Sequence, residues 1–305
     1  MARRRRRKKK SNDTLLVILL IIGILLYNKY GTNLSSAFEV KKEEPIPVVV
    51  NGTLEVEFID VGQADSILIR NNGENMLIDA GNNEDGTKLV SYFKNLGITN
   101  FKYVVGTHPH EDHIGGMDDI INNFTIDHFI IPDSYTTTLT FEEVLDALEQ
   151  RGMTFEVPEV DSTITLGEAN IYVLYTGTDT NDLNNASIVL KLIYGNNSFL
   201  FMGDAPSRVE KIIMDKEIKA DVLKTGHHGS RYSTTLGFLN KVKPKYAIIS
   251  CGTNNIYGHP HDSTINKLKN NNIEIYRTDL NGTIIMTSDG TNITVNTLQT
   301  DTNGG

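Results

Sequence analysis

One short segment, residues 107–116, constrains this chain more than any other. It reads Thr-His-Pro-His-Glu-Asp-His-Ile-Gly-Gly, so three of the chain's eight histidines and an aspartate lie within six positions. His108 and His110 are two residues apart and point the same way in extended backbone, whereas Asp112 and His113 face a second point. Imidazoles and carboxylates are ligands of zinc-like and manganese-like cations. The apolar run before the segment predicts a buried strand, which would present these ligands on a loop at a sheet edge.

The charge of the chain is divided unevenly. Its net charge is −9, yet eight of the 29 Lys and Arg residues lie in segment 3–10, which leaves 21 basic against 38 acidic residues, a balance of −17. An acidic body argues against broad electrostatic binding of nucleic acid.

The single cysteine, Cys251, excludes an internal disulfide and a Cys-rich zinc site, and the apolar run before it predicts a buried thiol.

The N-terminal segment predicts export of the body. Residues 15–27 are almost wholly apolar and would span ~20 Å as a helix, short of a ~30 Å hydrocarbon core. Snorkelling side chains and bilayer thinning can make up the difference, so we favour an uncleaved membrane anchor over a cleaved signal peptide. The basic residues before it predict a cytoplasmic N-terminus and an extracellular body.

We therefore expect one folded domain behind a tail, an anchor and a linker. The linker is charged and contains prolines, which suits a tether. The expected parts are a basic cytoplasmic tail (1–14), a transmembrane anchor or signal segment (15–30), a linker (31–50), a hydrolase domain (51–298) and a disordered tail (299–305).

The body alternates short strands with helices. Hairpin turns at 71–73 and 195–197 and helices between other strands predict two sheets with helices outside them. The expected helices are 86–96, 116–124, 141–150, 207–217, 235–242 and 263–271. The expected strands are 54–60, 66–70, 75–79, 101–106, 126–131, 186–194, 198–202, 221–225, 246–250 and 273–277, with others beginning near 154, 164 and 171 and two flanking 288–290.

Further strands end in groups that could bind metal or carry protons. Segment 199–204 is an apolar strand that ends at Asp204, and segment 222–230 ends in Gly-His-His-Gly-Ser with His227 and His228. Segment 257–261 holds a third pair, His259 and His261. Seven of the eight histidines thus lie in three clusters, which predicts one metal centre.

The pattern at 108–113, His-x-His-x-Asp-His, resembles the signature of the metallo-β-lactamase superfamily. Blocks at 58–66, 77–81, 203–204, 226–230 and 257–261 together resemble the extracellular hydrolase domain of ComEC-type competence proteins. The resemblance implies an α/β (α+β) fold, a four-layered αβ/βα sandwich with the metal site at one edge of the paired sheets, here preceded by one N-terminal hydrophobic helix. The multi-helix channel of ComEC proteins has no counterpart in this sequence, so we do not expect this chain to be the uptake channel.

The resemblance also implies a set of ligands for two divalent ions, zinc or manganese. His108 and His110 would bind the first ion, and Asp112 and His113 the second. Asp204 would bridge them, and one of His227 and His228 would complete the second site.

The first site lacks the further histidine that the superfamily usually supplies before the bridging aspartate. Segment 181–187 reads Asn-Asp-Leu-Asn-Asn-Ala-Ser, which leaves this site to be completed by Asp182, Asn185 or water. More oxygen ligands shift the preference from zinc toward manganese.

The same resemblance suggests roles in catalysis. Asp112 or Asp204 would orient the attacking oxygen, and the unligated histidine of His227 and His228, or His259, would protonate the leaving group. The expected substrate-binding residues are Ser230, Lys224 and Asn185, and the expected structural residues near the site are Asp60, Gln63, Asp65 and Asp79.

The leading hypothesis is an exported, membrane-anchored metal-dependent phosphodiesterase or nuclease that acts on a phosphodiester, possibly single-stranded DNA. A cell-wall or lipid phosphodiester of the phosphocholine type is the next candidate substrate, and a β-lactam or lactone is the third. A non-catalytic binding module is the alternative from another class. Protein partners cannot be inferred from the sequence.

Overall fold

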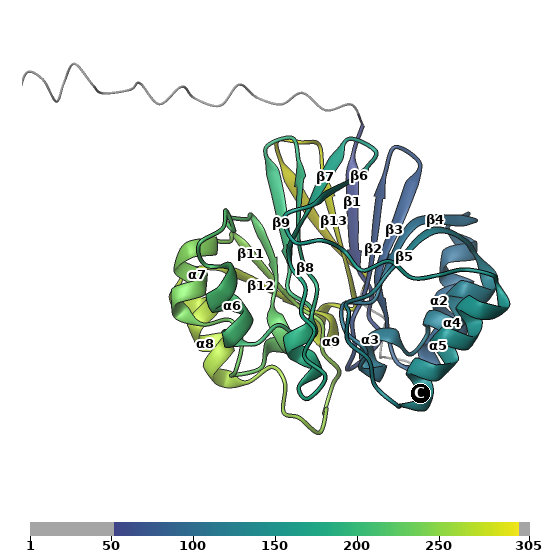
Figure 1. Ribbon diagram of the computed structural model, residues 1–305. Helices are drawn as coiled ribbons and strands as arrows, with labels where there is room; N and C mark the ends of the chain where they lie inside the picture. The colour runs from purple at the N-terminus through teal and green to yellow at the C-terminus, as the bar shows by residue number, and fades with distance from the viewer. Residues whose placement is uncertain (1–51, 299–305) are drawn as a thin grey trace, which may run out of the picture. The chain divides into compact units, whose positions relative to one another are not determined.

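The computed structural model describes residues 52–298. Two seven-stranded sheets lie face to face in it (Figure 1). The first sheet has the order β14-β13-β1-β2-β3-β4-β5, with β1 Leu54–Phe58, β2 Ser66–Asn71, β3 Glu74–Ala80, β4 Asn100–Val105, β5 Thr125–Ile130, β13 Thr283–Ser288 and β14 Ile293–Leu298. The second has the order β12-β11-β10-β9-β8-β7-β6, with β6 Thr163–Leu166, β7 Ala169–Tyr175, β8 Val189–Tyr194, β9 Asn197–Phe201, β10 Val222–Lys224, β11 Tyr246–Ile249 and β12 Glu274–Arg277.

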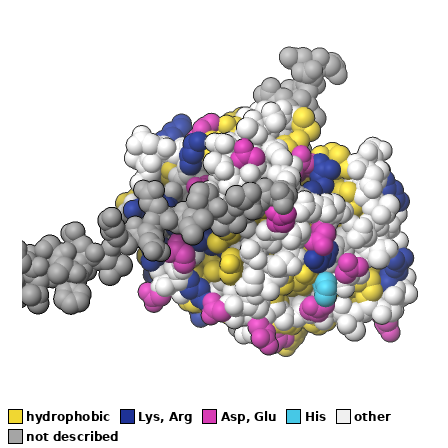
Figure 2. All heavy atoms as spheres, turned by 90° about the horizontal axis from the view of Figure 1, so that it is seen from above, with side chains coloured by type: hydrophobic (Ala, Val, Ile, Leu, Met, Phe, Trp, Pro, Cys, Tyr) yellow, Lys and Arg dark blue, Asp and Glu magenta, His cyan; other side chains and the backbone are white. Residues whose placement is uncertain are grey.

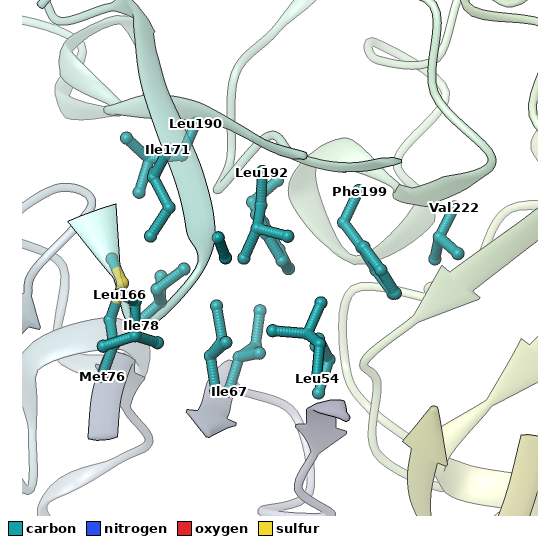
Figure 3. Close-up of a cluster of buried hydrophobic side chains, with 14 of the residues drawn as sticks. Leu54, Ile67, Met76, Ile78, Leu166, Ile171, Leu190, Leu192, Phe199 and Val222 are labelled. Atoms are coloured by element: carbon teal, nitrogen blue, oxygen red, sulfur yellow. The ribbon is translucent and has the colours of Figure 1, made fainter. Parts of the chain in front are cut away.

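The space between the sheets is filled by side chains from alternate strand positions. In β1, Leu54, Val56 and Phe58 point into this core and are fully buried. Figure 3 shows Leu54, Ile67, Met76 and Ile78 of the first sheet facing side chains of the second. The opposite face of β1 carries Glu57, which is buried as well; its carboxylate accepts hydrogen bonds from Arg70 and Tyr92, which offset the cost of burying its charge. Burial of alternate apolar positions fixes the register of each strand.

Helices cover the outer faces of both sheets (Figure 1). Apolar faces of α2 (Gly86–Asn95), α4 (Met117–Asn123) and α5 (Leu139–Gln150) pack on the first sheet. Those of α6 (Ser207–Ile213), α7 (Leu236–Val242) and α8 (Asp262–Asn270) pack on the second. The result is helix, sheet, sheet, helix, which confirms the predicted four-layered sandwich.

Some predicted elements differ from the structure. The strand expected near Thr154 does not form: only Glu156 makes an isolated bridge, to Ile130 at the sheet edge, and Pro158 has no amide hydrogen to extend the pairing. The helix expected over 207–217 ends at Ile213. The short helices α3 (Glu111–Ile114) and α9 (Thr278–Asn281) were not predicted.

The predicted N-terminal tail, anchor and linker, and the C-terminal tail, lie outside the described residues. Among residues 52–298, none of the helices has both the length and the apolar character that crossing a bilayer requires.

The topology brings the chemically important strand ends together. Strand β4 runs parallel to β3, and β9, β10 and β11 run parallel to one another, so the carboxyl ends of each set meet at one edge. A hydrogen bond from Ile188 N to Thr107 O, 2.9 Å long, links the segment after β4 to the segment before β8. Residues that follow β4, β9 and β10 therefore meet between the sheets.

Candidate metal centre

The turn after β4 is held in place by close backbone packing. It leads into α3, which carries Asp112 and His113. A Cβ atom on Gly115 would lie 2.3 Å from the backbone of Asn82 and Asn83, so only glycine permits this approach. The sequence Gly-Gly after the histidines is thus required to seat α3 against the loop after β3.

Four side chains from three strand ends form a compact cluster. Asp112, His113, Asp204 and His228 each offer a ligand atom, and these atoms all lie within 4.8 Å of one another. The Nε2 atom of His228 is 3.2 Å from Asp112 Oδ2 and 3.5 Å from Asp204 Oδ1. His113 Nε2 is 3.4 Å from the same Asp204 oxygen. Two imidazoles and two carboxylates around one point suit a divalent cation.

Two atoms at the centre of this cluster lack ordinary partners. Both His113 Nε2 and Asp204 Oδ1 are buried and make no hydrogen bond within residues 52–298. Leaving such polar atoms buried and unpaired costs free energy. Because they face each other within the ligand cluster, a cation between them would satisfy both, and the residues fit the metal site that the sequence predicts.

The other half of the site, around His108 and His110, is more open. His108 Nε2 lies 2.9 Å from His110 Nδ1 and 3.9 Å from Asp204 Oδ2. His227 Nε2 is 3.6 Å from that same oxygen. The two oxygens of Asp204 therefore face different histidine groups, which suits a bridging carboxylate. Asn185, expected as a possible ligand here, donates through Nδ2 to Asp179 Oδ2 at 3.1 Å, while its Oδ1 is buried and makes no hydrogen bond within residues 52–298.

Two buried aspartates orient the clustered histidines from behind. Asp79 Oδ2 lies 2.8 Å from His113 Nδ1 and also accepts a hydrogen bond from Thr107 Oγ1. Asp65 Oδ1 lies 3.5 Å from His228 Nδ1, which is 3.0 Å from Ser250 O. Partners of this kind fix the tautomer of a histidine ligand so that Nε2 faces the ion.

The pKa values of the buried ligands follow from burial and neighbouring charges. Burial, then His113, lowers the pKa of His108 well below its usual value, so this ring is neutral. Burial would lower the pKa of His228 too, but Asp204 and Asp65 outweigh it and raise the value to about 10. The proton on His228 balances the carboxylates, and a bound cation would take its place.

Lys224 does not serve the substrate role that was expected of it. Its side chain is fully buried, and its Nζ donates to Asp65 Oδ2 at 2.7 Å. Ser230 is also buried, at 1% exposure. These two predictions were wrong because both side chains face the interior, where they hold the backbone and Asp65 in place.

Asp60 and Gln63, both expected near the site, line different cavities. Asp60 accepts a hydrogen bond from Gly62 N and lines a different cavity, with Glu84 and Lys88, and not the pocket onto which the metal ligands face. Gln63 lines the metal-facing pocket, and its Oε1 accepts a hydrogen bond from Gly252 N at 3.1 Å.

A cavity of about 360 Å³ opens onto the cluster. It is lined by Gln63, Pro109, His110, Glu111, Asp112, Thr138, Asn184, Asp204, His227, His228, Tyr257 and His259. Asn184 was missed as a candidate although it lies in the Asn-rich segment; its Nδ2 is 3.4 Å from His227 Nδ1.

Burial and the neighbouring His227 and His228 lower the pKa of His259 to about 4. A ring that is neutral at pH 7 is a poor proton donor, which argues against the acid role expected of His259.

The loop after β10 adopts a conformation that is unusual for histidine. His227 and His228 have φ angles of 52° and 50°, in the left-handed region that side chains other than Gly, Asn and Asp rarely adopt. Strain of this kind is typical of functional sites. It allows two adjacent histidines to present their rings to one pocket.

Comparison with known proteins agrees with this geometry. The model of the family described as "Metallo-beta-lactamase superfamily" matches residues 59–253. The chain belongs to the metallo-β-lactamase superfamily. It thus has the fold of that superfamily's hydrolases together with a cluster of possible metal ligands.

Curated relatives include competence proteins. ComE operon protein 3 of Bacillus subtilis is 33% identical over 75% of this chain and 32% of the relative. Competence protein ComA of Neisseria gonorrhoeae is 30% identical over 74% of this chain and 31% of the relative. The chain thus spans about a third of these relatives, as the predicted resemblance to their hydrolase domain implies.

Among solved structures, the metallo-β-lactamase fold protein YhfI from Bacillus subtilis is similar to this chain. The two share 12% sequence identity with a TM-score of 0.56, over 78% of this chain and 100% of the other. At this identity the likeness supports the fold alone.

Proposed function

We propose that this superfamily member is a dinuclear metal-dependent phosphodiesterase that cleaves nucleic acid outside the membrane. The observation that carries the proposal is the two-sided arrangement around Asp204. One of its oxygens faces His113 and His228, and the other faces His108 and His227. Two divalent ions held in this way would activate water for attack and share the charge of a phosphodiester undergoing displacement.

Residues of the chain would orient the reaction. Asp112 lines the pocket, and although burial would raise its pKa, His113 and His228 lower the value to about 2. It is therefore ionised at pH 7 and can accept a hydrogen bond from the attacking water. Such orientation raises the rate by fixing the attacking oxygen near the phosphorus.

His227 is the better candidate for proton donor. Its side chain is 27% exposed and lines the pocket, unlike the buried ring of His228. The side-chain amide of Asn184 lies 3.4 Å from Nδ1 of His227, which leaves Nε2 toward Asp204 and the pocket. In its imidazolium form, a histidine so placed can give a proton from Nε2 to the leaving oxygen.

The composition of the two halves favours manganese in the more open one. His108 and His110 give two nitrogens, and Asp204 gives an oxygen. The described residues around this half include no further histidine besides His227. Water would complete the coordination, and oxygen-rich coordination suits manganese or magnesium.

The resemblance to competence proteins favours DNA as the polymer, whereas the acidic body favours short or single strands over long duplexes. On the face seen in Figure 2, basic side chains lie scattered among acidic ones and form no broad patch.

We further propose that residues 15–30 anchor the protein with this domain outside the cell. Protease added to intact cells should remove the domain; protection until lysis would contradict this orientation.

The test is an assay of purified protein with manganese or zinc against single-stranded DNA, bis-p-nitrophenyl phosphate and nitrocefin. Phosphodiesters should be cleaved, chelator should stop cleavage, and His110→Ala should abolish it. His128→Ala is the matched control, because His128 is a partly exposed histidine paired with Glu156 outside the site. Rapid turnover of nitrocefin without cleavage of either phosphodiester would refute the proposal.

A further inference from the structure

The rim of the metal-facing pocket carries an exposed aromatic ring. Tyr257 lines the pocket and is 61% exposed. Its ring lies parallel to that of His259, with 5.7 Å between centroids and an interplanar angle of 22°. His259 in turn stacks on His228, at 6.3 Å and 28°. A short series of ring faces therefore leads from solvent to a candidate metal ligand.

The loop that carries Tyr257 is held firmly. Asn255 Nδ2 donates to Gly252 O at 2.9 Å, and Asn255 Oδ1 accepts from His259 N at 2.9 Å. Gly252 N donates in turn to Gln63. Because these bonds close the loop on itself and tie it to the neighbouring segment, the exposed ring is presented in a fixed position, which lowers the entropic cost of binding to it.

Charge does not explain how a nucleic acid would be held here. The residues that line the pocket include Glu111, Asp112 and Asp204 but neither lysine nor arginine among the described part of the chain. The chain beyond its basic N-terminal run has a balance of −17. The electrostatic term that dominates most nucleic-acid binding is therefore confined to the bound metal, and another source of affinity is needed.

We propose, on the basis of the proposed phosphodiesterase function, that Tyr257 is a stacking platform for a nucleobase of single-stranded nucleic acid whose phosphate lies at the metal centre. Every base has a π-face, so stacking on an aromatic side chain tolerates any sequence. The ring of Tyr257 has one face against His259 and an exposed edge and outer face for a base. The platform is a positioning residue for substrate and takes no part in proton transfer.

The chain contains no tryptophan, so Tyr257→Trp introduces a single tryptophan at the platform, whose fluorescence can be excited selectively. With manganese present, a phosphorothioate-linked oligothymidylate should quench this fluorescence, and an abasic oligomer of equal length should not. Absence of quenching by oligothymidylate at concentrations that saturate the protein would overturn the inference.

Kinetics supply the second measurement. Tyr257→Ala should raise KM for single-stranded oligothymidylate roughly 5- to 150-fold with little change in kcat, and Tyr257→Phe should behave as wild type. For an abasic oligomer, Tyr257→Ala and wild type should share one KM. Tyr232→Ala is the matched control, because Tyr232 is 70% exposed but does not line the pocket. An unchanged KM for oligothymidylate in Tyr257→Ala would refute stacking.

The two proposals fail in different ways. If the wild type cleaves no phosphodiester with any metal, the proposed function is wrong, whereas quenching of the Tyr257→Trp protein would still support base stacking. If cleavage occurs and quenching does not, the stacking inference alone is overturned.

Discussion

Replacement of Lys224 by methionine tests whether the buried ion pair behind the metal centre holds the fold. Lys224 Nζ and Asp65 Oδ2 lie 2.7 Å apart, and neither side chain is more than 1% exposed. Methionine is similar in length but removes the cation, so the buried Asp65 carboxylate would lose the lysine of its ion pair. Loss of one partner of a buried pair costs ~3–5 kcal/mol, a large part of the ~5–15 kcal/mol that stabilises a typical native protein.

The assay is urea unfolding with chelator present, so that bound metal adds no stability. A loss of this size also lowers Tm by roughly 6–20 °C, at about 2–4 °C for each kcal/mol in a domain of this size. Lys102→Met is the matched control: Lys102 pairs with Glu74 at 2.8 Å, but these side chains are 26% and 37% exposed. Partly exposed pairs contribute only about 0–1 kcal/mol.

The double variant Asp65→Asn/Lys224→Met and the pH dependence sharpen the test. Removal of both charges should restore part of the lost stability, because no unpaired ion stays buried. Burial would raise the pKa of Asp65, but Lys224 and His228 outweigh it and hold the value below its usual range. The stability from this depressed pKa is present above the unfolded value of about 3.9 and is lost as pH falls below it. The reasoning is refuted if Lys224→Met loses no more stability at pH 7 than Lys102→Met.

Three further predictions concern the metal ligands and the single thiol. Elemental analysis should find about two manganese ions per chain in the wild type and at most about one in His228→Ala; equal amounts in both would contradict the ligand assignment. Metal affinity, measured by calorimetry, should rise with pH by about tenfold per unit for each proton displaced, because the pKa of His228 is raised to about 10 in the metal-free protein. An affinity that does not change between about pH 6 and about pH 8 would contradict this. Cys251 is fully buried and its thiol pKa is raised to about 12 by burial, with Asp279 adding to the shift, so a thiol-reactive dye should label the folded protein only after urea is added; rapid labelling without urea would show that the thiol is accessible.

The local sequence predicted most of the elements, because each depends on short-range spacing. Alternating apolar residues in β1 and the periodic apolar face of α2 are visible within single segments. The family resemblance then predicted the four layers. The clustering of His108, His110, Asp112 and His113 could be predicted because these residues lie within six positions. Their roles as ligands remain a prediction.

Only the tertiary structure decided which polar side chains face the pocket and which are buried in the protein interior. Lys224 and Asp65 are 159 positions apart, so their pairing depends on how the two sheets meet, and no local pattern distinguishes a buried lysine from a phosphate-binding one. The same holds for His227 and His228: they are adjacent in sequence, and left-handed backbone angles decide which ring contacts Asp112. Periodicity determines which face of an element is apolar, but the meeting of distant strand ends determines the chemistry between them.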